Sequence, residues 1–138
     1  MSRYAEFETK IKSDKGLSAA LTEMGFIHEC HEEPVTLYDW HGKARPEIAN
    51  IVIRRKDTGI GASNDIGFVK QADGTYRAII SDYDRGSRFN DAWLGKLHAE
   101  YNVSEQIAIQ RRLGHVLHSR EVVQVNGRNQ VKLRFTAR

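Results

Sequence analysis

The chain has 138 residues, of which 40% are hydrophobic and 28% are charged, and this is the composition of one ordinary globular domain. A single cysteine, Cys30, excludes an internal disulfide framework and is typical of a reducing compartment. The N-terminus is charged and lacks a signal-peptide core, and no apolar run approaches the ~20 residues that span a bilayer, so we expect a cytoplasmic protein.

The net charge of +3 is unevenly distributed along the chain. Residues 110–138 hold seven Lys and Arg against one acid, a net charge of +6, whereas residues 1–109 carry a net charge of −3. A basic C-terminal part of this kind favours an anionic partner, although solubility alone explains such an imbalance equally well.

The first elements follow from periodicity and capping. Apolar and charged residues alternate over 3–12, which predicts a strand with one buried face. Ser13 supplies an N-cap and Gly25 a C-terminal stop, so we expect a helix over about 14–24. A second strand is expected over 26–33, where Pro34 interrupts it.

The central stretch gives the strongest signal in the chain. After an apolar strand over 48–53, residues 64–84 contain two runs rich in β-branched and aromatic residues. These runs flank Asp73-Gly74, a pair that reverses a strand easily, so the sequence predicts a hairpin here.

Helical periodicity follows this hairpin. The stripe formed by Phe89, Trp93, Leu97 and Tyr101 recurs every four residues and predicts a helix whose aromatic side chains lie in the core. Asn102 and Glu105 have the spacing of a capping box, which predicts that a new helix starts there and ends at Gly114.

Two strands, near 115–125 and 129–136, end the chain. If Val123 and Val125 share a face with Val131, Leu133 and Phe135, a two-residue turn of Asn126 and Gly127 is wrong by one position. We therefore expect a three-residue turn over 126–128.

The predicted order is β-α-β-β-β-β-α-α-β-β. Hairpin connections dominate it, so we expect residues 1–138 to form a single α+β domain. Its mostly antiparallel sheet has about six to seven strands, with two to three helices packed on one face.

Three segments resemble a known family when they are taken together. They are the opening strand and helix from Ser2-Arg3-Tyr4 to Phe26, the strand Asp65-Ile66-Gly67-Phe68, and the hairpin end Ser81-Asp82-Tyr83-Asp84. The chain resembles the domain-of-unknown-function family 1257, whose best-known members are the hypothetical chloroplast open reading frame 35 proteins of cyanobacteria and algal plastids. Members usually begin Met-Ser-His-Phe, whereas Arg3 and Tyr4 stand in the last two places here, so no role for that histidine transfers.

The family has no established activity. The resemblance therefore implies a small protein that depends on a partner, with an AAA-type ATPase as the suggested partner, and it supplies no catalytic residues. We expect no cofactor, and the sequence leaves the oligomeric state open.

The segment around residue 30 contains the common ligands of transition metals. On a strand, His28 and Cys30 share a face, whereas His31 points the other way, so a metal site needs further ligands from elsewhere in the chain. A solvated strand edge is the simpler interpretation, and a metal-dependent enzyme is the weakest of the functions considered.

Carboxylates gather near the end of the central hairpin. Asp65, Asp82 and Asp84 would bind Mg²⁺ or act as an acid–base pair if they met. Ordinary loop chemistry, with Asp84 paired to Arg85 or Arg88, is the favoured alternative. The sequence contains no nucleophile elbow and no phosphate-binding loop, so nothing in it argues for an enzyme.

The basic C-terminal strands are the candidate contact surface for nucleic acid or for a partner. Lys132 and Arg134 should face away from Leu133, and the candidate set is Arg111, Arg112, Arg120, Arg128, Lys132 and Arg134. A solvated sheet face is the simpler alternative. Tyr38, Trp40, Asp82 and Asp84 are candidates for a protein interface.

The sequence alone therefore favours a small adaptor that acts by protein–protein contact. A nucleic-acid-binding module that uses the basic C-terminal hairpin is the alternative.

Overall fold

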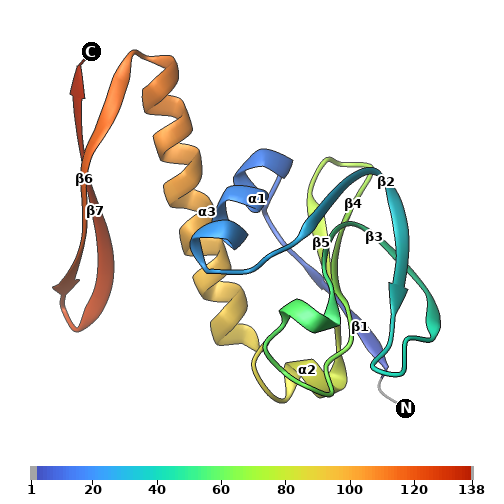
Figure 1. The fold of residues 1–138 in the computed structure, drawn as a ribbon. Helices are drawn as coiled ribbons and strands as arrows, with labels where there is room; N and C mark the ends of the chain where they lie inside the picture. The colour runs from blue at the N-terminus through green and yellow to red at the C-terminus, as the bar shows by residue number, and fades with distance from the viewer. Residues whose placement is uncertain (1–2, 138) are drawn as a thin grey trace. The chain divides into compact units, whose positions relative to one another are not determined.

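A computed structural model describes residues 3–137 of the chain. The elements are β1 (Tyr4–Glu8), α1 (Asp14–Glu23), β2 (Glu29–Tyr38), β3 (Ala44–Ile53), the 3-10 helix η1 (Arg55–Asp57), β4 (Ile66–Lys70), β5 (Tyr76–Ser81), α2 (Asp82–Arg85), α3 (Asp91–Arg112), β6 (His115–Val125) and β7 (Arg128–Ala137). Apart from η1, this order confirms the predicted succession of strands and helices and the α+β class (Figure 1).

The strands form two sheets. Five of them make an antiparallel sheet in the order β1-β5-β4-β3-β2, and β6 pairs with β7 in a separate two-stranded sheet. The described residues divide into two compact units between Tyr101 and Asn102, and α3 runs across this division. Within the described residues, no helix is both long and apolar enough to cross a membrane.

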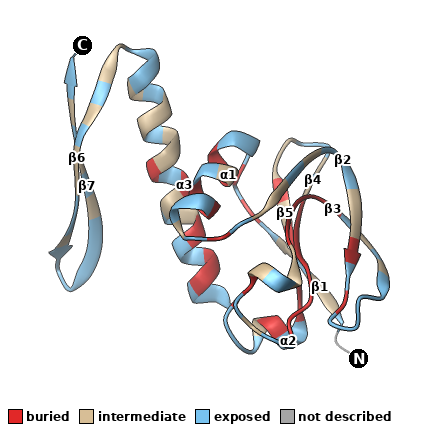
Figure 2. Ribbon diagram, in the orientation of Figure 1, coloured by how far each residue is buried: buried red, intermediate tan, exposed pale blue. Residues whose placement is uncertain are grey.

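The core of the first unit lies between one face of the five-stranded sheet and the helices α1 and α3 (Figures 1 and 2). Phe68 contributes a fully buried side chain from the sheet. The rings of Phe26 and Phe89 lie 5.6 Å and 4.8 Å from that of Trp93, both edge-on. The helical stripe from Phe89 to Tyr101 is buried, which confirms its prediction as core.

The caps of α1 form as its sequence predicts. The side chain of Ser13 accepts a hydrogen bond of 3.0 Å from the backbone N–H of Gly16, and this satisfies one free donor at the helix start. Gly25 follows the helix with φ +87°, a conformation that glycine adopts without steric cost.

The central hairpin also confirms its prediction. β4 and β5 pair from Gly67 opposite Ile79 to Lys70 opposite Tyr76, and the turn between them contains Asp73 and Gly74. Asp73 accepts hydrogen bonds from the backbone N–H and the hydroxyl of Thr75, at 2.9 and 2.6 Å, which hold the turn closed.

The predicted break in the helix at Asn102 is wrong. α3 continues without interruption from Asp91 to Arg112, and its start is capped by Asn90, which accepts a 3.0 Å hydrogen bond from the backbone N–H of Trp93. An interior Asn costs only a fraction of a kcal/mol, less than about 0.7, so the continuous backbone hydrogen bonding of the helix outweighs a local capping signal.

The predicted three-residue turn after Val125 is also wrong. Val125 pairs directly with Arg128, and the two turn residues, Asn126 and Gly127, have φ of 52° and 75°. These positive values identify the primed two-residue turn that Asn-Gly favours. The premise of that prediction is also wrong, because Val123 and Val125 lie on the face opposite to Val131, Leu133 and Phe135. The irregularity of this pair of strands is a bulge in β6 between Leu117 and Ser119.

Candidate functional site

The candidate metal ligands do not come together. The ring nitrogens of His28 are both engaged, with Nε2 2.7 Å from Ser18 Oγ and Nδ1 2.9 Å from the carbonyl oxygen of Phe26. His31 Nε2 lies 2.8 Å from Glu29 Oε1, and Cys30 is an exposed free thiol. Over residues 3–137 no group of three or more His, Cys, Asp or Glu is placed to hold a metal ion.

An ion-pair network joins β2, β3 and the segment before β4. Arg54 binds Glu29 through two hydrogen bonds of 3.0 Å, and its Nη1 lies 2.8 Å from Asp65 Oδ2. The buried Asp65 carboxylate also accepts from the backbone N–H groups of Tyr38 and Arg55, each at 2.8 Å. These bonds hold three separate stretches of chain together, so Asp65 serves the fold.

The pKa of Glu29 gives this network a measurable pH dependence. Hydrogen bonds from Arg54, and then from His31, lower the pKa of Glu29 from 4.5 to about 2. Because the folded-state pKa is the lower one, the stabilisation is complete above about pH 4.5 and is lost as the pH falls towards 2.

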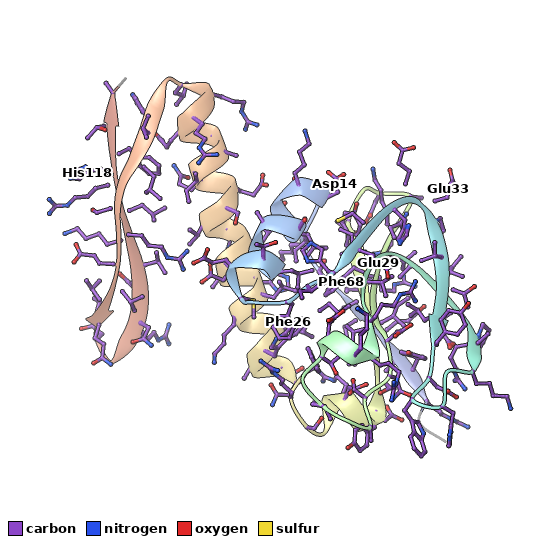
Figure 3. All side chains as sticks on the ribbon, in the orientation of Figure 1. Asp14, Phe26, Glu29, Glu33, Phe68 and His118 are labelled. Atoms are coloured by element: carbon purple, nitrogen blue, oxygen red, sulfur yellow. The ribbon has the colours of Figure 1, made fainter. Side chains whose placement is uncertain are left out.

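We therefore expect Glu29→Gln to lower the free energy of unfolding at neutral pH, and the deficit to shrink progressively below about pH 4.5. Urea unfolding of wild type and variant across this range measures the effect. Glu33→Gln is the control, because Glu33 is exposed on the same strand (Figure 3) and makes no ion pair with the described residues. A deficit that stays constant down to pH 2 would contradict this assignment.

Asp84 is fully buried and is not part of an exposed surface. Its carboxylate accepts from Ser63 Oγ and Ser81 Oγ, each at 2.7 Å, and from the backbone N–H of Asn64 at 3.1 Å. The proposed pairing of Asp84 with Arg85 or Arg88 is wrong. Arg85 binds Asp91 at 2.8 Å, and Arg88 donates to the carbonyl of Thr58 at 2.9 Å.

The three carboxylates of the predicted acidic cluster have different surroundings. Asp82 is exposed at the start of α2, Asp84 is buried among hydroxyl and amide donors, and Asp65 binds Arg54. Within residues 3–137, no two of these carboxylates share a hydrogen-bond or ion-pair partner, so the geometry gives no support to an acid–base pair. Asp82 keeps the exposure that an interface residue needs, whereas burial removes Asp84 from any surface.

Tyr38 and Trp40 lie at the end of β2 and just beyond it, and both are exposed, at 41% and 44%. The Trp40 ring stacks on His41 with 3.7 Å between ring centroids, and the Arg54 guanidinium lies over the Tyr38 ring at 5.7 Å. These contacts fix both rings at the surface, so they stay candidates for a protein interface.

The pairing of β6 with β7 decides which basic residues share a face. Directly opposed residues point to the same side of an antiparallel pair, and Lys132 lies opposite Glu121 while Arg134 lies opposite Ser119. Arg128, Lys132 and Arg134 therefore line one face of the hairpin. Arg120 lies opposite Leu133 and faces the other way, so the prediction that it joins this row is wrong.

Valines lie beside this basic row. Val123 lies opposite Gln130, and Val125 lies opposite Arg128, so both are on the basic face. The other face carries Val122, opposite Val131, together with Leu133 and Phe135. We call the described side chains of β6 and β7 the hairpin surface.

No described residue of the hairpin surface is buried (Figure 2). Val122 is 62% exposed and Val125 42% exposed. His118, at the bulge, is exposed as well (Figure 3). Arg111 and Arg112 are exposed in the last turn of α3, where positive charge interacts favourably with the helix C-terminus, so their position has a structural reason of its own.

Comparison with known proteins places the chain in a family without assigning it an activity. A profile described as "Protein of unknown function (DUF1257)" matches residues 20–131, which extends over parts of both compact units. No curated protein and no solved structure matches the chain. The family predicted from the opening helix and the central hairpin is thus confirmed, and the chain belongs to the DUF1257 family of proteins of unknown function.

Proposed function

We propose that this protein is an accessory protein that binds a protein partner through its hairpin surface. The observation that carries the proposal is that β6 and β7 have apolar side chains on both faces, yet none of their described residues is buried.

A two-stranded sheet is marginally stable in water unless it packs against something else. Each exposed valine that becomes covered contributes about 1.5 kcal/mol or more through apolar burial. Val122 and Val125 lie on opposite faces of the hairpin, so a partner that encloses the hairpin covers both and supplies stabilisation that the hairpin lacks. This couples the ordering of the hairpin to binding.

The charge pattern defines the partner chemically. Arg128, Lys132 and Arg134 form a positive row beside the valines Val123 and Val125. A complementary protein surface carries carboxylates next to apolar side chains, because each basic residue needs an acidic partner once water is excluded. An AAA-type ATPase is the first class of partner to seek, on the strength of the family resemblance.

Nucleic acid is the second candidate, and the net charge of +6 over residues 110–138 favours it. Two features of the basic face weaken it. Glu121 lies opposite Lys132 within the row, and no aromatic side chain lies on that face to stack against a base. Valines beside the basic row suit a protein surface better than phosphates.

Purification of the tagged full-length protein from its native cells, with and without nuclease, separates the two candidates. We expect a stoichiometric protein partner that survives nuclease. Val122→Asp should reduce its recovery about ten-fold, because a charge at a buried contact costs more than 1 kcal/mol. Lys132→Glu with Arg134→Glu should reduce recovery as well and make it less sensitive to salt.

Ile27→Asp is the matched control, since Ile27 is 71% exposed and lies in the first unit. The circular dichroism spectrum of each variant tests whether the hairpin persists, and Val122→Ser provides a milder replacement if Val122→Asp unfolds it. Recovery of nucleic acid alone, lost in high salt, would overturn the proposal. Equal recovery of the partner by Val122→Asp and wild type would overturn it as well.

A further inference from the structure

A cavity of about 440 Å³ lies in the first unit, between the end of α1 and the start of α3. Met24 and Phe26 line it at the end of α1, and Ala92 and Trp93 line it from the first turn of α3. These side chains form an apolar wall that is continuous with the main core, because Phe26 and Trp93 both belong to that core. The volume is within the range of small-molecule sites, about 300–1,000 Å³.

The indole N–H of Trp93 is a buried donor without an acceptor. Trp93 is 6% exposed, and none of the described residues accepts a hydrogen bond from its Nε1. The great majority of buried polar groups in proteins are paired, and an indole N–H can only donate. Because Trp93 borders the cavity, an acceptor oxygen on a bound ligand completes the bonding that the protein leaves open.

The packing around Trp93 fixes the position of this donor. Its ring lies edge-on to the rings of Phe26 and Phe89, at 5.6 and 4.8 Å between centroids. Its backbone N–H donates to Oδ1 of Asn90, which caps α3 and also lines the cavity. The cavity thus lies at the N-terminus of a long helix, where the aligned peptide dipoles favour negative charge.

Two cations, Arg88 and Lys96, line the same cavity, and no acidic residue lines it. The Arg88 guanidinium lies 4.7 Å from the centroid of the Phe26 ring, and its Nη1 donates to the carbonyl oxygen of Thr58, which leaves the other two guanidinium nitrogens available. Lys96 follows Trp93 by three residues on α3, so the two side chains share a face of the helix. Within residues 3–137, neither cation forms a salt bridge. Both are exposed, so their charge sets the sign of the ligand, whereas the buried donor sets where the ligand binds.

We propose that this cavity binds a small carboxylic acid with an apolar body. The carboxylate accepts from the Trp93 indole N–H and pairs with Arg88 and Lys96, and the apolar body covers Met24 and Phe26. Both parts of the ligand contribute to specificity. A bare anion leaves the apolar wall in contact with water, and an uncharged ligand leaves the two cations unpaired.

NMR of the ¹⁵N-labelled full-length protein tests this inference through the indole N–H signals of its two tryptophans, Trp40 and Trp93, which Trp40→Phe assigns. Benzoate, phenylacetate and hexanoate are titrated in turn, up to millimolar concentration. At least one of them should move the Trp93 indole proton downfield in a saturable way, because that N–H gains an acceptor, while the Trp40 signal stays in place. Trp93→Phe, followed at the backbone amide of Lys96, should weaken the binding about ten-fold, since it removes a hydrogen bond to a charged group.

Lys96→Gln provides a second variant that leaves the core intact, and it should weaken the binding about three-fold, the effect of losing one exposed ion pair. Lys15→Gln is its matched control, because Lys15 is exposed on α1 and does not line the cavity. The uncharged amide of the best acid should bind at least about ten-fold more weakly than the acid, and so should inorganic phosphate.

Equal binding of the amide or of inorganic phosphate would overturn the assignment to a carboxylic acid with an apolar body. A Trp93 indole signal that no acid moves would overturn it too, as would equal affinities of wild type, Trp93→Phe and Lys96→Gln. The hairpin takes no part in this experiment, so its outcome is independent of the proposed partner binding.

Discussion

Asp84→Ala is expected to lower the free energy of unfolding by about 3 kcal/mol, a large loss for one substitution. The fully buried carboxylate accepts from Ser63 Oγ, Asn64 N and Ser81 Oγ at 2.7 to 3.1 Å. Alanine removes both carboxylate oxygens at once and leaves the backbone N–H of Asn64 and the hydroxyl of Ser81 buried without an acceptor. The carboxylate therefore organises the junction between β5 and α2 and ties it to the segment before β4.

Urea unfolding at neutral pH measures this loss. Asp82→Ala is the control, because Asp82 is exposed two residues earlier and should change stability by less than about 0.5 kcal/mol. Asp84→Asn should fall between the two, since the amide keeps one oxygen acceptor but introduces a donor among donors. An equal, small effect of Asp84→Ala and Asp82→Ala would show that the network does not support the fold.

Gly67→Ala is expected to lower the free energy of unfolding by about 2 kcal/mol through overpacking. Gly67 lies on β4 against the smaller core on the second face of the sheet, formed by Leu37, Ala49, Val52 and Ile79. A Cβ at this glycine would lie 2.5 Å from the Cβ of Ala49 and 3.1 Å from Cδ1 of Leu37. Relief of this contact requires a backbone shift in β3 or β4, and the backbone hydrogen bonds between the two strands oppose such a shift.

A compensating change makes this prediction specific. Ala49→Gly removes the nearest atom, so the double variant should be more stable than the sum of the two single losses predicts. Gly61→Ala is the control, because a Cβ there meets nothing within 4 Å. Strict additivity of Gly67→Ala and Ala49→Gly in chemical unfolding would rule out the clash as the cause.

Local signals in the sequence were sufficient for the elements that depend on local chemistry. Ser13 and Gly25 delimit α1, Asp73-Gly74 marks the central hairpin, and the stripe from Phe89 to Tyr101 faces the core. In each case the signal comes from residues that are close together in the sequence, so the pattern of residue types is enough to predict the element.

Features that depend on distant residues were not predictable in the same way. Arg54 meets Glu29 across 25 positions of the sequence, and Tyr4 donates its hydroxyl to the carbonyl of Asp65 across 61. No periodicity or motif marks such pairs. The turn prediction failed because it assumed that Val123 and Val125 share a face with Val131, whereas both lie on the opposite face of the hairpin.

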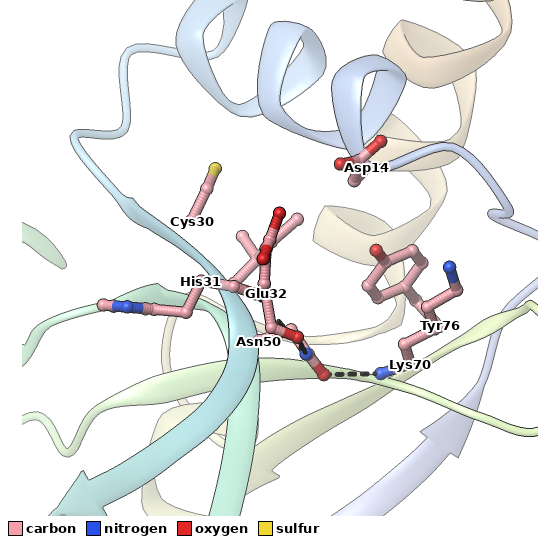
Figure 4. A pocket seen from close by; sticks show the side chains of 8 residues that line it. Asp14, Cys30, His31, Glu32, Asn50, Lys70 and Tyr76 are labelled. Carbon is pink, nitrogen blue, oxygen red and sulfur yellow. Dashed lines mark hydrogen bonds between the residues drawn. The ribbon is translucent and has the colours of Figure 1, made fainter.

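For the candidate site, too, local features were predicted and features that depend on distant residues were not. The alternation that puts Lys132 and Arg134 on the face opposite to Leu133 was visible in the sequence, whereas the predicted facing of Arg120, Val123 and Val125 was wrong. The arch of β2 was not predicted, since there the residues between Cys30 and Val35 face the single β3 residue Asn50 (Figure 4). That arch arises from the pairing of β2 with β3, and the sequence of neither strand alone specifies this pairing.

Photo-crosslinking from the hairpin tests partner binding most directly. We would place benzoylphenylalanine at Val122 of the full-length protein in its native cells, and at Ile27 as the control, since both side chains are well exposed at 62% and 71%. We expect a discrete protein adduct from Val122 that persists after nuclease and is absent from Ile27. An adduct to nucleic acid, a crosslink only within the chain itself, or no adduct at all would contradict it.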